Sequence, residues 1–186
     1  RDGMTEAEEQ DVLCTAAKLA NISVYEHAQL SEEFRGMGTT LVAALIQGDC
    51  ATVINVGDSR AYRFDGEAMH QISEDHSYVE EMRRRGKITE ADARTHPQKN
   101  LITRAVGVEP YVEGDLFEVR LTEKDMLLLC SDGLTGMTED SRIAEVLSNA
   151  PTLELAGDAL LQLALDGGGR DNITVALFTL GKKQGA

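Results

Sequence analysis

Cysteine is scarce in this sequence, and its scarcity excludes two kinds of site. The three cysteines, Cys14, Cys50 and Cys130, form an odd and widely spaced set that predicts neither a disulfide framework nor a Cys-x-x-Cys metal site. None of them has arginine six positions later, as the phosphate loop of a cysteine-nucleophile phosphatase requires. Reduced thiols in the cytoplasm are the expectation that remains.

Long apolar runs and an excess of basic residues are also absent. No stretch approaches the ~20 apolar residues that cross a bilayer, and no basic leader with an apolar core and small cleavage residues is visible. With 32 acidic against 18 basic residues, the formal net charge is −14. This charge repels nucleic acid and anionic membranes, and we expect neither a nucleic-acid partner nor a membrane span. Phosphorylated proteins stay open as partners, because a bound metal ion reverses the field locally.

The apolar pattern predicts grouped strands rather than strands that alternate with helices. A long helix is expected at 5–29, where Thr5 and Glu8 form a capping box. Further helices are expected at 138–148 and 152–165, with shorter helical pieces over 77–93. Strand-like runs occupy 39–47, 51–56, 61–64, 67–71, 111–120, 126–130 and 173–180. The sequence therefore predicts an α+β fold in one domain, 1–186, without repeats or linkers.

Three acidic residues follow or precede strand-like runs. Asp132 directly follows the run 126–130, Asp171 precedes the last strand, and Asp75 follows the run 67–71. Carboxylates at strand ends beside glycines suit hard cations such as Mg²⁺ and Mn²⁺. Asp-Gly and Asp-Asn pairs are also common turn and capping devices. On spacing alone both interpretations stay open, and the turn is the more frequent one.

Seven short motifs favour the metal-ligand interpretation, because in order and spacing they resemble bacterial members of the protein phosphatase 2C family. The motifs run through most of the chain: GMGTT at 36–40, NVGDSRAY at 55–62, EDHS at 74–77, GKIT at 86–89 with HP at 96–97, LITRA at 101–105, LCSDGL at 129–134 and DNITV at 171–175.

The resemblance implies a sandwich of two antiparallel sheets flanked by helix pairs, with two Mg²⁺ or Mn²⁺ ions at one end. It implies hydrolysis of phosphoserine and phosphothreonine on proteins by a metal-activated water, in opposition to a serine/threonine kinase. Asp132 and Asp171 match ligands of the first metal. Asp75 matches an aspartate that, with Asp132, holds a third and weaker metal in bacterial members. The stretch 79–108 matches a mobile flap that influences substrate selection.

Other polar residues of these motifs receive structural interpretations. Asp58 is expected to accept backbone N–H bonds in a turn, and Arg60 is expected on the surface of a strand. His76 and His96 are candidate general acids only in principle, and for His96, which precedes a proline, a loop role is the interpretation we prefer. The arginines at 83–85 are expected on a solvated helix face, with phosphopeptide docking as the minority alternative.

The family's N-terminal segment has no counterpart here. That segment carries a phosphate-binding arginine, an Asn-Glu-Asp motif and an Asp-Gly-Met-Gly-Gly-His strand end. Asp2-Gly3-Met4 is a partial match, but Thr5-Glu6 replaces the glycine pair, and we interpret it as a coincidence. The sequence thus predicts an N-terminally incomplete domain, without the first strands, the first helix and the catalytic residues they bring.

Activity of the chain alone is therefore expected to be impaired. A shortened chain, unobserved residues and natural loss of the segment stay open as explanations. A noncatalytic module that binds a partner or phosphopeptide is the alternative function.

Overall fold

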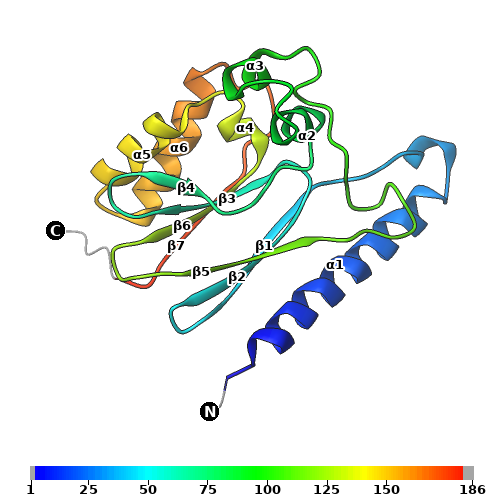
Figure 1. Cartoon of the computed structure of the whole chain (residues 1–186), viewed down its shortest axis with the longest axis horizontal. Coiled ribbons are helices and arrows are strands. Elements are labelled where there is room, and N and C mark those ends of the chain that lie inside the picture. Colours follow the sequence, from blue (N-terminus) through cyan, green and yellow to red (C-terminus); the bar gives the residue numbers. More distant parts are fainter. Residues whose placement is uncertain (1–2, 182–186) are drawn as a thin grey trace.

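Two antiparallel sheets lie face to face at the centre of the structure, a computed structural model that describes residues 3–181 (Figure 1). The first sheet has the order β1 (Leu41–Gln47), β2 (Cys50–Val56), β5 (Asp115–Arg120). The second has the order β4 (Met69–Gln71), β3 (Arg60–Phe64), β6 (Met126–Cys130), β7 (Val175–Thr179). All pairings are antiparallel, which confirms the α+β prediction.

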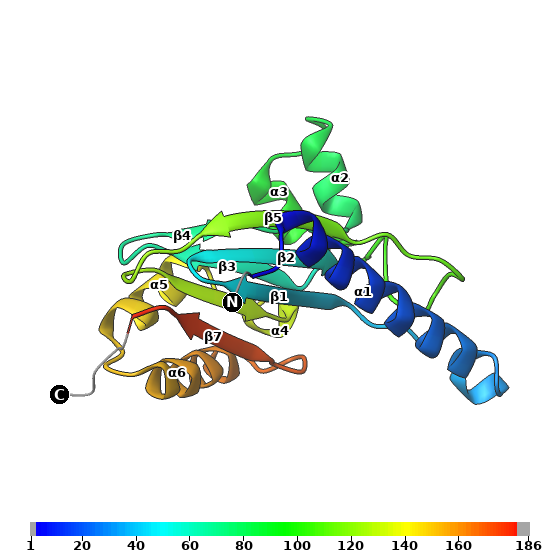
Figure 2. The ribbon, with the colours of Figure 1, turned by 90° about the horizontal axis from the view of Figure 1, so that it is seen from below.

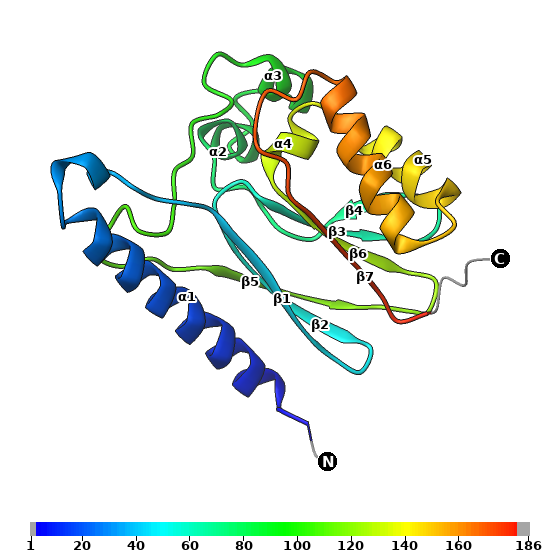
Figure 3. The same cartoon turned by 180° about the vertical axis from the view of Figure 1, so that it is seen from behind.

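Helices cover the outer faces of both sheets. A single long helix, α1 (Glu6–Ala28), lies along the first sheet, and α5 (Asp140–Asn149) and α6 (Leu153–Asp166) pack on the second (Figures 2 and 3). The shorter α2 (Tyr78–Arg84) and α3 (Glu90–Thr95) lie together at one end of the molecule. A one-turn helix, α4 (Asp132–Thr135), follows β6, and a 3₁₀ turn, η1 (Glu32–Phe34), follows α1.

The strand β6 shows why an uninterrupted apolar run lies at the centre of this fold. Successive side chains of a strand point to opposite faces. Leu128 packs toward α5 and α6 against Leu147 and Leu160, whereas Leu127 packs toward the first sheet against Ala51. Because both faces are buried, the strand carries apolar residues throughout, and each fully buried leucine contributes roughly 1.5–3 kcal/mol.

The helix α1 forms for the reasons that its sequence indicates. Thr5 is the N-cap: its backbone N–H donates to Glu8 Oε2 over 2.7 Å, and its hydroxyl accepts from the Glu8 N–H over 3.4 Å. The buried face of the helix places Leu13 and Ala17 against Ile54 of the first sheet. The predicted helix at 5–29 is confirmed within one residue at each end.

One predicted boundary was wrong, and one helical turn was not predicted, each for a physical reason. The strand expected at 111–120 begins only at Asp115, which pairs with Asn55 near the end of β2. Beyond Val56 the chain leaves the first sheet at Gly57, whose φ is +104°, so residues 111–114 have almost no neighbouring strand with which to pair. The helical turn α4 was not among the expected helices, because a single turn has no apolar period to reveal it.

Candidate metal centre

Three strand ends meet at one edge of the second sheet. The strand β6 lies between β3 and β7, and its last residue, Cys130, pairs with the first residue of each neighbour. Asp58 lies two residues before β3, Asp132 two residues after β6, and Asp171 four residues before β7. The register therefore brings three carboxylates from distant parts of the sequence to the same edge.

Ser131 ties the loops of Asp132 and Asp171 together. Its backbone N–H donates to the carbonyl of Thr174 over 3.1 Å. Its hydroxyl accepts from the Thr174 N–H over 3.0 Å and donates to the carbonyl of Asn172 over 3.1 Å. These bonds leave little freedom for the two aspartates to move apart, because each is a direct neighbour of a bonded residue.

Gly133 allows a close approach of the same two loops. A Cβ atom at this position would lie 2.3 Å from the carbonyl oxygen of Asn172, well inside van der Waals contact. Glycine alone therefore fits between Asp132 and the loop that carries Asp171. This constraint gives the Asp-Gly pair a structural reason apart from turn formation.

The carboxylates at this edge act on one another electrostatically. Burial, and then the charge of Asp171, raise the pKa of Asp132. Burial, and then the charges of Asp132 and Asp75, raise the pKa of Asp58 to about 6. Two like-charged groups raise each other's pKa when they lie close together. The four aspartates thus form one cluster with an excess of negative charge, which we call the aspartate cluster.

Asp58 is the member of the aspartate cluster that the sequence analysis did not assign to the site. It is half-buried and lies in the expected turn, where a hydrogen bond with its own backbone amide partly opposes the rise in its pKa. Its motif, NVGDSRAY, contained a usable signal. The turn at 57–59 connects β2 to β3, so Asp58 lies at the same strand edge as the residues around Cys130.

Asp75 lies in the same cluster but is already engaged by Arg60. The guanidinium binds both carboxylate oxygens, with Nε 2.8 and 3.0 Å and Nη2 2.6 Å away, and its Nη1 donates to the Tyr62 hydroxyl over 3.0 Å. The expectation of a surface strand arginine was wrong. Arg60 starts a strand whose alternate residues, Tyr62 and Phe64, face the core, so its side chain points to the same covered side.

His76 supports the turn that carries Asp58. Its Nδ1 accepts the N–H of Gly57 over 3.0 Å, and its Nε2 lies 3.1 Å from a carboxylate oxygen of Asp115. Although burial opposes the shift, the ion pair with Arg104 and the nearby His76 lower the pKa of Asp115. With only 7% of its surface exposed, His76 serves structure rather than proton transfer to a substrate.

The helices α2 and α3 form an excursion that closes next to the cluster (Figure 1). A β-bridge between Ser77 and Ile102 joins its two ends, only two residues after Asp75. The rings of Tyr78 and His96 contact each other at a tilt of 51°, with centroids 5.9 Å apart, which supports the loop interpretation of His96. The arginines at 83–85 are exposed and each pairs with a glutamate, as expected for a solvated helix face.

The donor set suits a hard divalent ion but is not a complete cage. Carboxylate oxygens are the ligands that Mg²⁺ and Mn²⁺ take, usually together with several waters. Asp132 and Asp171 bring two such carboxylates to adjoining strand ends. Within residues 3–181, no three His, Cys, Asp or Glu side chains are arranged to hold a metal ion. The partial match at Asp2-Gly3-Met4 begins outside the described residues.

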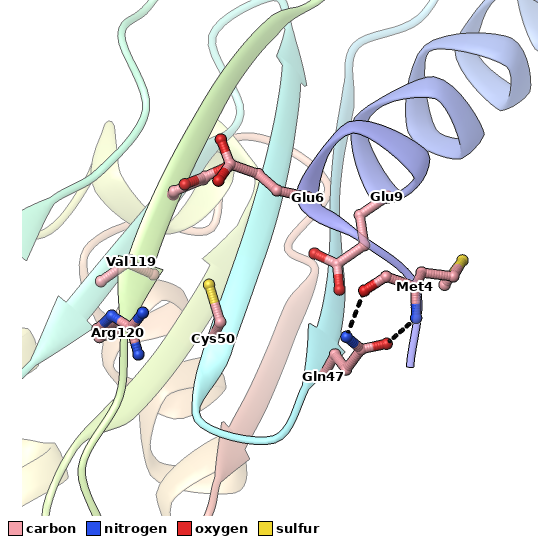
Figure 4. Close-up of a pocket in the computed structure, with 8 residues that line it drawn as sticks. Met4, Glu6, Glu9, Gln47, Cys50, Val119 and Arg120 are labelled. Carbon is pink, nitrogen blue, oxygen red and sulfur yellow. Dashed lines mark hydrogen bonds between the residues drawn. The ribbon is translucent and has the colours of Figure 1, made fainter. Parts of the chain in front are cut away.

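A separate cavity of about 400 Å³ opens at the opposite end of β2 (Figure 4). Glu6 and Glu9 of α1 face Cys50 and Arg120 across it. Since β2 runs from Cys50 to the turn that carries Asp58, this cavity does not belong to the aspartate cluster.

No helix in the described part of the chain has the length and hydropathy needed to span a bilayer.

Comparison with known proteins gives consistent matches. The sequence profile described as protein phosphatase 2C matches residues 1–165. The serine/threonine phosphatase stp of Listeria innocua is 45% identical over 157 residues, which cover 84% of this chain and 62% of that protein. The chain thus spans less than two thirds of that relative's length.

Solved structures match both the fold and the sequence. The crystal structure of the serine/threonine phosphatase Stp1 from Staphylococcus aureus has a TM-score of 0.91 at 40% identity, covering 97% of this chain and 71% of that one. The catalytic domain of the serine/threonine protein phosphatase PstP, solved in complex with two manganese ions, has a TM-score of 0.83 at 34% identity, covering 95% and 72%.

Proposed function

The chain belongs to the protein phosphatase 2C family, and from this premise we propose that it forms most of a metal-dependent domain that hydrolyses phosphoserine and phosphothreonine on proteins. The observation that supports the proposal best is the meeting of three strand ends, which brings Asp58, Asp132 and Asp171 to one edge of the second sheet, with Asp75 beside them through its pair with Arg60.

In this proposal Asp132 and Asp171 hold the first divalent ion. Asp75, with Asp132, holds a weaker one. Bound Mg²⁺ or Mn²⁺ supplies a water of lowered pKa and neutralises charge on the phosphoryl group. Two features hold the loops of these aspartates together: the hydrogen bonds of Ser131 to Asn172 and Thr174, and the close approach of the loop at 172–174 that Gly133 allows.

The proposal extends to partners and location. The excursion at 79–108 is assigned the selection of phosphoprotein substrates, because its base joins the chain two residues after Asp75. A serine/threonine kinase is the enzyme whose products this activity would reverse. A cytoplasmic location is supported by the free thiols of Cys14, Cys50 and Cys130.

A noncatalytic module that binds a phosphopeptide is the second candidate. It is favoured by one observation: among the described residues, no complete set of metal ligands is assembled. The chain would then keep the fold and the docking surface of the family without turnover.

A phosphothreonine peptide separates the two candidates. The 186-residue chain is incubated with the peptide and Mn²⁺, then with excess EDTA, and phosphate release and peptide binding are both measured. Phosphate release that stops on chelation supports the hydrolase, even at a low rate. Peptide binding without any phosphate release supports the noncatalytic module and contradicts hydrolysis by this chain.

A further inference from the structure

We propose that the guanidinium of Arg60 competes with a divalent ion for Asp75 and thereby keeps metal binding at this carboxylate weak. The proposal rests on the metal-dependent function proposed above and assigns to Arg60 a regulation of that site. In this proposal a metal ion must either share Asp75 with the guanidinium of Arg60 or displace the guanidinium from it.

The contacts of Asp75 leave little room for a second cation. Its Oδ1 accepts from Arg60 Nε over 2.8 Å and from Gln71 Nε2 over 3.1 Å. Its Oδ2 accepts from Arg60 Nε over 3.0 Å and from Nη2 over 2.6 Å. A carboxylate offers about four lone-pair sites, and donors already point at both of its oxygens. A metal ion that takes Asp75 must therefore loosen the pair with Arg60.

The pair is partly shielded from water, which strengthens it. The exposed fractions of the side chains are 28% for Arg60 and 11% for Asp75. Bidentate charge-assisted pairs are stronger than single contacts, and salt screens them less when they are partly buried. Arg60 therefore competes with a divalent ion for Asp75 more strongly than a solvated surface arginine would.

Arg60 is held in place from its other side as well. Its Nη1 donates over 3.0 Å to the hydroxyl of Tyr62, a residue with no exposed surface. This anchor keeps the positive charge beside the aspartate cluster even when a metal binds.

A purely positioning role for Arg60 predicts the opposite result. If the guanidinium only held Asp75 in an orientation that suits a metal, its removal would weaken metal binding. If it competes, its removal tightens metal binding at the weak site, because both the direct contacts and the repulsion between like charges disappear. The sign of the change decides between the two roles.

The test is a Mn²⁺ titration of the 186-residue chain by calorimetry, with manganese magnetic resonance as a second readout that needs no substrate. For Arg60→Gln we expect the weaker binding step to tighten by about tenfold, the factor that corresponds to 1.4 kcal/mol. Arg63→Gln is the matched control, since Arg63 lies on the opposite face of the same strand and should bind as the unchanged chain does. Adding Asp75→Asn to Arg60→Gln should remove the gain.

The outcomes separate this inference from the proposed function. Equal or weaker Mn²⁺ binding in Arg60→Gln, with binding intact in the unchanged chain, overturns the role of Arg60 and leaves the metal site standing. Absence of Mn²⁺ binding in both chains overturns both proposals. If Arg60→Gln fails to fold by circular dichroism, Arg60→Lys replaces it. Its single ammonium cannot make the bidentate contacts, so we expect several-fold tighter binding, and unchanged or weaker binding refutes the competition.

Discussion

At the scale of single residues, the negative charge of the aspartate cluster determines which ligands can bind at this edge of the second sheet. The charges of Asp75 and Asp132 help to raise the pKa of Asp58, the charge of Asp171 helps to raise that of Asp132, and Arg60 is the cation that partly offsets both shifts. Carboxylates gathered in this way destabilise the empty protein and favour a bound cation.

The raised pKa of Asp58, about 6, gives the folded protein a pH dependence. A carboxyl whose pKa is higher in the folded than in the unfolded chain binds more protons when folded between the two values. The stability that this extra proton binding adds to the folded protein is fully present below about pH 4, and it is lost as the pH rises through 6. In EDTA, we expect Asp58→Asn to stabilise the protein at pH 7 by about 1 kcal/mol, a value reduced for partial exposure to solvent.

Urea unfolding at several pH values measures this effect. The variant should also lose the fall in stability between pH 4 and 6 that Asp58 causes in the unchanged chain. A variant that is less stable at pH 7 would show that Asp58 makes a favourable contact instead. Asp158→Asn, on the exposed surface of α6, controls for the change in net charge.

At the scale of elements, the loops between strands position the site more tightly than the strands do. The bonds of Ser131 and the narrow space at Gly133 fix the end of β6 against the start of β7. A change in this contact should therefore affect both stability and the spacing of the aspartates.

Gly133→Ala tests the close approach. Its Cβ would lie 2.3 Å from a backbone carbonyl oxygen of Asn172, so the two loops must separate, at a cost of about 1–3 kcal/mol. We also expect weaker Mn²⁺ binding, because Asp132 and Asp171 move apart. Gly157→Ala is the matched control: nothing lies within 4 Å of its Cβ position, and alanine in a helix should stabilise by about 0.5–1 kcal/mol.

The two faces of α1 provide a second comparison at this scale. Leu13 is 8% exposed and packs against Ile54, whereas Leu19 on the same helix is 62% exposed. Leu13→Ala should lower the free energy of unfolding by about 2–4 kcal/mol, and Leu19→Ala by less than about 0.5 kcal/mol. Equal losses in urea unfolding would mean that the outer face of α1 is buried in solution.

The periodicity of the sequence predicts the elements of this fold but not the contacts between them. The helix at 5–29 and the strand at 126–130 were predictable from capping and from the apolar run. The pairing of Arg60 with Asp75 was not, because it depends on which face of β3 is buried. The late start of β5 was not either, because it depends on where its partner β2 ends.

The candidate site was predictable in part. Asp132, Asp171 and Asp75 were identified from strand ends and from the family resemblance, but their relation in space needed the register of β3, β6 and β7. Asp58 was assigned to a turn because a single strand end does not reveal which other ends lie beside it.

At the scale of the whole molecule, the chain has the two stacked sheets expected of the family. Among the described residues, the helix α1 covers the first sheet, and α5 and α6 cover the second. It spans 62% of the length of the stp protein of Listeria innocua. The aspartate cluster lies entirely on the elements that are present. Metal binding by Asp132 and Asp171 is therefore a property that this chain can be tested for by itself, apart from turnover.

Calorimetric titration of the 186-residue chain with Mn²⁺ tests most directly whether Asp132 and Asp171 share one divalent ion. We predict a tighter binding step that is lost in Asp132→Asn and equally in Asp171→Asn, while Asp158→Asn binds as the unchanged chain does and all variants keep their circular dichroism spectrum. Unaltered Mn²⁺ affinity in either of the first two variants would contradict this prediction.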